Sequence, residues 1–230
     1  MPPVRSAPAV LLGCLFCLAA LAPAAIATSP VDLALVLAID VSLSVDAGEY
    51  ALQKEGIARA VADPAVVQAI TAGRHGAIEL AVLEWSGRDQ QVVAVPWSRI
   101  DGAGSAADFA TRLRAVRRSS HGLTDIGEAL LAAQALLNHL PAPADRRLVD
   151  VSGDGMANFG PPVDSVRDRL VAAGITINGL AIRNDEPWIG DYYDRMVIGG
   201  PGAFLIEAGS FADFAQAMRG KLIGEVIARR

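Results

Sequence analysis

Residues 33–44 read Leu-Ala-Leu-Val-Leu-Ala-Ile-Asp-Val-Ser-Leu-Ser, an uncharged apolar run that stops at an acid and two hydroxyls. The apolar run is too short to span a membrane. It fits a strand buried on both faces of a parallel sheet, although periodicity alone does not separate such a strand from a buried helix segment. Ligands of open α/β sheets bind at the carboxyl ends of strands. Asp40, Ser42 and Ser44 therefore predict hard oxygen ligands aimed at one divalent cation.

Ordinary loop chemistry is the alternative explanation for the same residues. Asp and Ser are common after strands, and the Ser44 hydroxyl could cap the first turn of a following helix. A metal site therefore needs further ligands elsewhere in the chain.

The amino-terminal residues 1–27 have the pattern of a secretory signal peptide. Arg5 supplies the positive start, an apolar stretch follows, and Ala25-Ile26-Ala27 offers the small residues that precede cleavage. We expect residues 28–230 to form the mature domain, either periplasmic or secreted. The cleavage pattern favours removal of the leader over its retention as a membrane anchor.

Both cysteines, Cys14 and Cys17, lie in this leader, so the mature chain would carry no thiol. Their spacing predicts neither a redox nor a zinc motif, because a leader offers no second ligand pair. Leu12-Gly13-Cys14 matches a lipoprotein signal poorly, and we therefore favour an ordinary signal peptide. A domain without thiols suits an exported protein.

Without the leader the chain has 19 basic and 25 acidic residues, a net charge near −6. This balance argues against nucleic acid or an anionic membrane surface as the partner. Three arginine pairs, at 117–118, 146–147 and 229–230, are expected to be solvated surface. About 200 residues, half of them apolar, predict a single α/β domain.

Helical and strand patterns alternate beyond the first strand. The helical patterns cover residues 48–61, 106–116, 125–138, 163–173, 188–197 and 210–227, and the strand patterns cover 78–85, 91–97, 147–151, 175–182 and 204–207. Only about five residues separate the strands at 78–85 and 91–97, which forces an antiparallel hairpin. Pro96 places the second of these strands at a sheet edge.

Two further loops offer oxygen ligands. Thr124 precedes the helix at 125–138, where it could equally be the N-cap residue. Asp154, in Ser152-Gly153-Asp154-Gly155, follows the strand at 147–151, and an ordinary Asp-Gly turn is the alternative there.

The order of these motifs resembles the von Willebrand factor type A (vWA) domain: Asp40-x-Ser42-x-Ser44 after the first strand, Gly122-x-Thr124 before a helix, and Asp154-Gly155 after a later strand. The resemblance covers the whole mature chain. The stretch Val-Ile-Gly-Gly-Pro-Gly-Ala-Phe at 197–204 is similar to an exported bacterial subfamily without an assigned function.

The resemblance implies a doubly wound, mostly parallel six-stranded sheet in the order 3-2-1-4-5-6, with one antiparallel edge strand and helices on both faces. It also implies a metal-ion-dependent adhesion site (MIDAS) for Mg²⁺, with Mn²⁺ or Ca²⁺ as alternatives. Ser42 and Ser44 would be direct ligands, Thr124 would move in or out of contact, and Asp40 and Asp154 would act largely through water. An Asp or Glu of a protein partner would complete the coordination.

An enzyme is the competing class, and a metal-assisted hydrolase of phosphate or ester is its form here. The three histidines, His75, His121 and His139, lack the spacing of a zinc site, and His121 is expected to be solvated. The sequence has no nucleophile elbow and no phosphate-binding glycine loop. We therefore assign no catalytic residue. Tyr192 and Tyr193 could line a partner surface or cover neighbouring strand ends.

Overall fold

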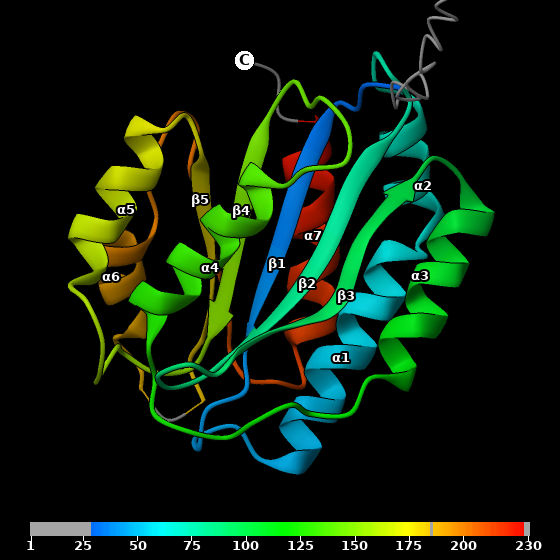
Figure 1. Ribbon diagram of the computed structural model, residues 1–230. Helices are drawn as coiled ribbons and strands as arrows, with labels where there is room; N and C mark the ends of the chain where they lie inside the picture. Colours follow the sequence, from blue (N-terminus) through cyan, green and yellow to red (C-terminus); the bar gives the residue numbers. More distant parts are fainter. Residues whose placement is uncertain (1–28, 185, 228–230) are drawn as a thin grey trace, which may run out of the picture.

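The computed structural model describes residues 29–184 and 186–227, so the predicted leader at 1–27 lies outside the described residues (Figure 1). A six-stranded sheet in the order β3-β2-β1-β4-β5-β6 forms its centre. The strands are β1 (Leu33–Asp40), β2 (Ile78–Trp85), β3 (Gln91–Ile100), β4 (Arg147–Gly153), β5 (Thr176–Ile182) and β6 (Leu205–Ala208). The β2–β3 pair is antiparallel and the other pairs are parallel. The predicted strand order and antiparallel edge are confirmed.

Helices cover both faces of the sheet (Figure 1). They are α1 (Ala47–Val61), α2 (Pro64–Thr71), α3 (Ala103–Ala115), α4 (Ile126–Asn138), α5 (Val163–Ala172), α6 (Ile189–Tyr192), the π-helical turn η1 (Tyr193–Val197) and α7 (Phe214–Ile227). The sequence reading missed α2, although Asp63 caps it and Pro64 starts it. Among the described residues, no helix combines the length and the apolar character that crossing a membrane requires.

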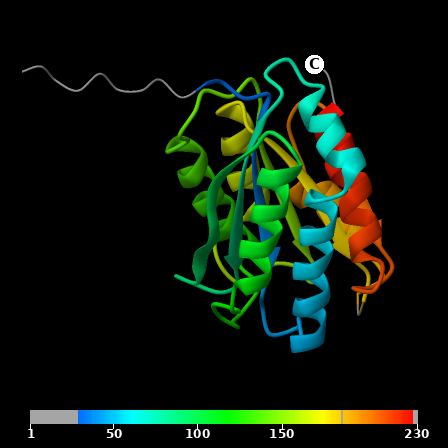
Figure 2. The ribbon, with the colours of Figure 1, turned by 90° about the vertical axis from the view of Figure 1, so that its right-hand side faces the viewer.

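The central strand β1 divides the core in two by the alternation of its side chains. Its larger residues, such as Leu35 and Leu37, pack with α1, α2, α3 and α7. Ala34, Val36 and Ala38 face α4, α5 and the α6–η1 segment. Figure 2 shows α7, in red, beside α1 and α2, in blue-cyan and cyan, on the same face of the sheet. Burial on both faces explains why the run at 33–39 is apolar throughout.

The edge strand β3 accommodates Pro96 through an irregularity in its pairing with β2. The register shifts between Leu80 and Val82, opposite the segment that contains Pro96. A proline lacks the N–H that a regular ladder needs, and an edge strand with a bulge tolerates this loss.

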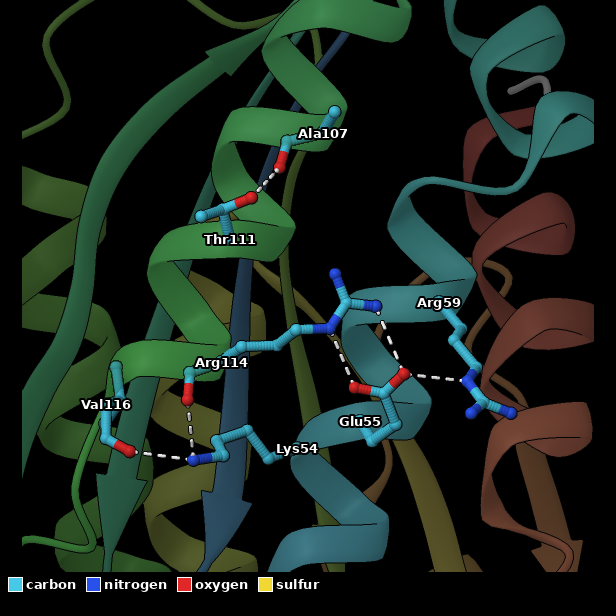
Figure 3. Close-up of polar contacts among 7 residues, drawn as sticks. All are labelled: Lys54, Glu55, Arg59, Ala107, Thr111, Arg114 and Val116. Atoms are coloured by element: carbon cyan, nitrogen blue, oxygen red, sulfur yellow. Dashed lines mark hydrogen bonds and ion pairs between the residues drawn. The ribbon is translucent and has the colours of Figure 1, made fainter.

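Polar side chains join α1 to α3 and fix the start of the loop that leads to Thr124 (Figure 3). Glu55 accepts two hydrogen bonds from Arg114, at 2.8 and 3.1 Å. These bonds are the main cause that lowers the pKa of Glu55 to about 2. Lys54 Nζ donates to the carbonyls of Arg114 and Val116 at 3.0 and 2.8 Å. The exposed carbonyls at the end of α3 are thereby satisfied.

A buried polar cluster attaches α7 to the sheet. Lys221, which is fully buried, lies 3.1 Å from Asp150 Oδ1 on β4 and 2.8 Å from Glu225 Oε1. Asn178 on β5 donates to Glu225 Oε1 at 3.0 Å. Arg146 donates to the carbonyls of Glu225 and Val226, so the prediction that it is solvated surface is wrong. Two buried acidic side chains thus share one ammonium group.

Burial, reinforced by the charge of Glu225, raises the pKa of Asp150 well above its usual value. An unfolded chain releases this proton near pH 4, whereas the folded protein keeps it to a higher pH. The contribution of Asp150 to the free energy of unfolding therefore decreases as the pH rises through this range.

We expect Lys221→Met to lower the free energy of unfolding by about 3–5 kcal/mol, because it removes the buried cation that both acidic side chains contact. Asp150→Asn keeps the Lys221–Glu225 pair and should flatten the loss of stability between pH 6 and pH 9. Urea unfolding of the three proteins at both pH values measures these effects. Equal pH dependence in the wild type and Asp150→Asn would contradict this account of the cluster.

Candidate metal centre

The register of β1 and β4 places the first and last predicted ligands side by side. Ile39 pairs with Ser152, so Asp40 lies level with Gly153, and Asp154 follows at once. Both strands are parallel and end at the same edge of the sheet, the lower edge in Figure 1. Asp40 and Asp154 are buried, with exposed fractions of 0% and 2%.

The loop after β1 is folded by its own polar groups. Asp40 Oδ1 accepts a hydrogen bond from the backbone N–H of Ser42 at 2.7 Å. Helix α1 is capped by Asp46, which forms a capping box with Glu49. The alternative in which Ser44 caps this helix is therefore wrong, and the Ser44 hydroxyl is available for other contacts.

A chain of hydroxyls connects the first loop to the third. The Oγ atoms of Ser42 and Ser44 lie 3.1 Å apart, and Ser44 Oγ donates to Asp154 Oδ1 at 2.7 Å. Ser42 is buried, whereas Ser44 is exposed. Three residues separated by as many as 110 positions in sequence therefore form one polar cluster.

Thr124 joins the same region from the start of α4. The N-cap residue of α4 is Asp125, which accepts from the N–H of Glu128, so the alternative role of Thr124 as the cap is wrong. Thr124 exchanges two hydrogen bonds of 3.0 Å with Asn158, in the loop after β4. Its hydroxyl would lie 3.8 Å from a Cβ placed on Gly155, beside Asp154. The structure thus brings Asp40, Ser42, Ser44 and Asp154 together and places Thr124 beside Gly155, the residue that follows Asp154.

The charge of Asp154 and burial disfavour the ionised form of Asp40. Burial is the main cause that raises the pKa of Asp40 to about 7, and the negative charge of Asp154 is the next. Asp40 Oδ2 is buried and has no hydrogen-bond partner among the described residues. Such an oxygen is a place where a cation or a water molecule would be stabilising.

Tyr193 also belongs to this site, which sequence reasoning missed. Its hydroxyl is buried without a hydrogen-bond partner in the described part of the chain. A Cβ on Gly153 would lie 2.6 Å from this hydroxyl and 2.8 Å from Asp40 Oδ2. Both oxygens therefore lie against the backbone of Gly153. Burial, followed by the charges of Asp40 and Asp154, raises the pKa of Tyr193 well above its usual value. The phenol therefore keeps its proton and can donate it.

The position of Tyr193 follows from a π-helical turn, η1, a feature frequent at functional sites. The neighbouring Tyr192 hydroxyl accepts from the N–H of Ala157, in the Asp154 loop. Of the two roles considered for these tyrosines, covering the strand ends agrees with the burial of Tyr193.

Two supporting side chains hold the backbone around the cluster. Arg118 donates to the carbonyls of Val41 and Ser42, both at 2.8 Å, so the prediction that it is solvated surface is wrong. Gln53 on α1 donates to the Asp40 carbonyl at 2.9 Å and accepts from Ser152 Oγ at 3.1 Å. His121 is exposed, as predicted.

The donor set consists of three hydroxyls and two carboxylates, and all its atoms are oxygens. Hard oxygen ligands suit Mg²⁺, Mn²⁺ and Ca²⁺. The unpartnered Asp40 Oδ2 and the charge repulsion at Asp154 are the features that a divalent cation would relieve. The residues present therefore fit a hard divalent cation.

A family model described as "Protein of unknown function (DUF1194)" matches residues 30–230. A comparison with curated proteins gave no match. Solved structures are similar in fold, at identities below 20%. A vWA protein from Catenulispora acidiphila has 18% identity and a TM-score of 0.57, covering 85% of this chain and 43% of that one. The predicted vWA fold is thus confirmed.

Proximal thread matrix protein 1 of the mussel byssus has 17% identity and a TM-score of 0.64, over 86% of this chain and 48% of that chain. Another structure of the same protein, at 17% identity, TM-score 0.59 and coverage of 84% and 47%, has a zinc-occupied MIDAS motif. The vWF domain of the pilus tip protein Mfa5 from Porphyromonas gingivalis has 12% identity and a TM-score of 0.58, over 87% of this chain and 97% of that chain. The chain spans about half the length of the mussel protein.

Gly153→Ala should destabilise the protein by about 1–3 kcal/mol, because the new methyl group would collide with Tyr193 and Asp40. Gly155→Ala is the matched control, since its nearest neighbour would be 3.8 Å away. Urea unfolding measures both. Adding Tyr193→Phe to Gly153→Ala should recover part of the loss, and equal stability of the two alanine variants would contradict the close approach.

Proposed function

The chain belongs to DUF1194, a family of proteins of unknown function, and from this premise and its vWA fold we propose that it is a metal-dependent protein-binding module. We propose Asp40, Ser42, Ser44, Thr124 and Asp154 as the residues that hold the divalent cation, Mg²⁺ in the first instance. The cation would bind an Asp or Glu side chain of a protein partner. We further propose that the module works outside the cytoplasm, in the periplasm or as a secreted protein.

One observation carries this proposal: two buried carboxylates from adjacent strands meet a hydroxyl chain at one edge of the sheet. The charge of Asp154 helps to raise the pKa of Asp40, and the Ser44 hydroxyl donates a hydrogen bond to Asp154. A cation or a water molecule would satisfy Asp40 Oδ2, which is buried without a hydrogen-bond partner among the described residues.

The residues have distinct roles in this proposal. Ser42, Ser44 and Thr124 supply neutral oxygens, which leave much of the charge of a bound cation uncompensated. Asp40 and Asp154 would accept hydrogen bonds from water molecules and from the ligand hydroxyls. The Tyr193 hydroxyl would hold the Asp40 carboxylate in place. When bound, the cation supplies a position for a carboxylate from another molecule.

Exposed apolar side chains border the three ligand loops. Leu43, between the two serines, is 69% exposed; Leu123, next to Thr124, is 47% exposed; and Met156, two residues after Asp154, is 41% exposed. The loops of Leu43 and Leu123 are joined by a hydrogen bond from Leu43 N to Gly122 O. Exposed apolar groups beside a binding site favour a partner whose acidic residue has apolar neighbours.

The comparisons support a binding role over catalysis. Similar folds include a matrix protein with a zinc-occupied MIDAS motif and a pilus tip protein. The side chains that we place at the site are hydroxyls and carboxylates in contact with one another, and the nearby His121 is exposed. We therefore keep metal-assisted hydrolysis only as an outcome of the test below.

Mg²⁺ should raise the melting temperature of the wild type, and EDTA should lower it. At a hundredfold excess over its dissociation constant, a ligand adds about 2.7 kcal/mol. Each kcal/mol corresponds to about 2–4 °C for a domain of this size. Asp40→Ala should abolish the response. Asp46→Asn removes a nearby charge from the α1 cap, and this variant should still respond to Mg²⁺ as the wild type does. The comparison separates metal coordination from general effects of charge.

A melting curve of the wild type that is unchanged by Mg²⁺ and EDTA would refute the metal site. Turnover of a phosphate or carboxylate ester that requires Mg²⁺ and disappears in Asp154→Ala would instead assign the protein to the hydrolases.

Partner capture should depend on both the cation and the apolar border. We expect the immobilised protein to retain an envelope protein in Mg²⁺ but not in EDTA, and Asp40→Ala to retain none. Leu43→Ser together with Leu123→Ser should reduce capture at least tenfold while leaving the Mg²⁺ shift in melting temperature unchanged. Quantitative mass spectrometry of the eluates measures capture. Equal capture in Mg²⁺ and EDTA would contradict a cation-mediated contact.

A further inference from the structure

A second group of metal-ligating side chains lies where the parallel strands begin, at the end of the sheet opposite to the Asp40 site. Asp32 directly precedes β1, His75 lies between α2 and β2, and Asp145 lies between α4 and β4. A ligand atom of each residue lies within 4.8 Å of the others. The eight residues of β1, about 26 Å at ~3.3 Å per residue, separate this group from Asp40.

The backbone holds two of these residues in fixed positions. Val31 forms a β-bridge with Ala144. Its N–H donates to the Pro143 carbonyl at 2.9 Å, and its carbonyl accepts from the N–H of Asp145 at 3.0 Å. Asp32 and Asp145 therefore follow directly from residues that pair with each other.

Asp32 in turn positions His75. The backbone N–H of His75 donates to both carboxylate oxygens of Asp32, at 3.0 and 3.1 Å, and Ala77 N–H donates at 3.4 Å. A Cβ on Gly73 would collide with the Asp32 carboxylate, so glycine leaves the space that the carboxylate fills. A carboxylate has about four lone-pair positions, and these bonds leave acceptor capacity on Asp32.

The imidazole of His75 is the least satisfied member of the group. Its Nε2 atom has no exposed surface and no hydrogen-bond partner among the described residues. Asp145 Oδ2 lies 3.3 Å from this nitrogen. The ion pair with Asp145 involves only the imidazole of His75. The Asp32 carboxylate, held by the backbone N–H groups of His75 and Ala77, also lies within 4.8 Å of both ligand atoms.

We propose that Asp32, His75 and Asp145 form a second divalent-cation site, which prefers Zn²⁺ and Co²⁺ to Mg²⁺. One imidazole and two carboxylates from separate connections form a three-ligand set with open positions, which suits Zn²⁺ and Co²⁺. A cavity of about 610 Å³, lined by Asp32, Asp145, Gly73 and Arg74 among others, leaves room for water or an exogenous ligand in those positions. This donor set differs from the oxygen-only set around Asp40.

A cation at this position would join three connections that are separated in sequence. It would fix the start of β1 to the segments that precede β2 and β4, the two strands on either side of β1. The inference does not depend on the proposed function, because its residues and its preferred ions are different.

Titration of the untagged protein with Co²⁺ tests this proposal, because d–d absorption bands report the ligand set of the ion. The wild type and Asp40→Ala should give the same bands and the same affinity. His75→Asn and Asp145→Asn should bind Co²⁺ at least tenfold more weakly and lose the bands, and competition with Zn²⁺ should remove the bands from the wild type. His139→Asn, at the exposed end of α4, is the matched histidine control and should behave as the wild type.

Circular dichroism of each variant separates loss of a ligand from loss of the fold. If His75→Asn fails to fold, Asp145→Asn decides, since its side chain is 44% exposed and its shape is retained. The proposal is overturned if the wild type gives no Co²⁺ bands. It is also overturned if the bands persist in folded Asp145→Asn or disappear in Asp40→Ala.

Discussion

The pairing of β1 with β4 forces two carboxylates together at the edge of the sheet. Ile39 lies opposite Ser152, so Asp40 and Asp154 leave their strands at nearly the same level. Both are buried, and the charge of Asp154 adds to the burial that raises the pKa of Asp40. The surrounding features depend on this constraint: Gly153 lacks a side chain because Asp40 and Tyr193 fill its space, and Ser44 joins the two loops.

The architecture could be predicted from sequence because local patterns express it directly. The apolar run at 33–39 gave β1, and the short connection between 78–85 and 91–97 gave the antiparallel edge. Errors occurred where several residues compete for one local role. Asp125 rather than Thr124 caps α4, and Asp46 rather than Ser44 caps α1, because a carboxylate at those positions reaches the free backbone N–H groups.

The rest of the site could not be predicted because distant residues supply it. Tyr193 follows Asp40 by more than 150 positions, and no spacing rule relates them. The Lys221–Asp150–Glu225 cluster and the Asp32–His75–Asp145 group likewise combine side chains from separate elements. The histidines show no zinc-site spacing in the sequence, yet the folded chain places a ligand atom of His75 within 4.8 Å of the carboxylates of Asp32 and Asp145. Long-range convergence of this kind is visible only once the strands have been aligned.

The exposure of the candidate ligands changes steeply across the site. Asp40 and Ser42 are closed off by the sheet and by α1, whereas Ser44 faces solvent. In the proposed function, the cation and the partner's carboxylate would both approach from the side of Ser44. A bound partner would block the exit of the ion beneath it, so dissociation would be ordered, with the partner leaving first. The lifetime of the ion in the complex would then be set by the partner's off-rate.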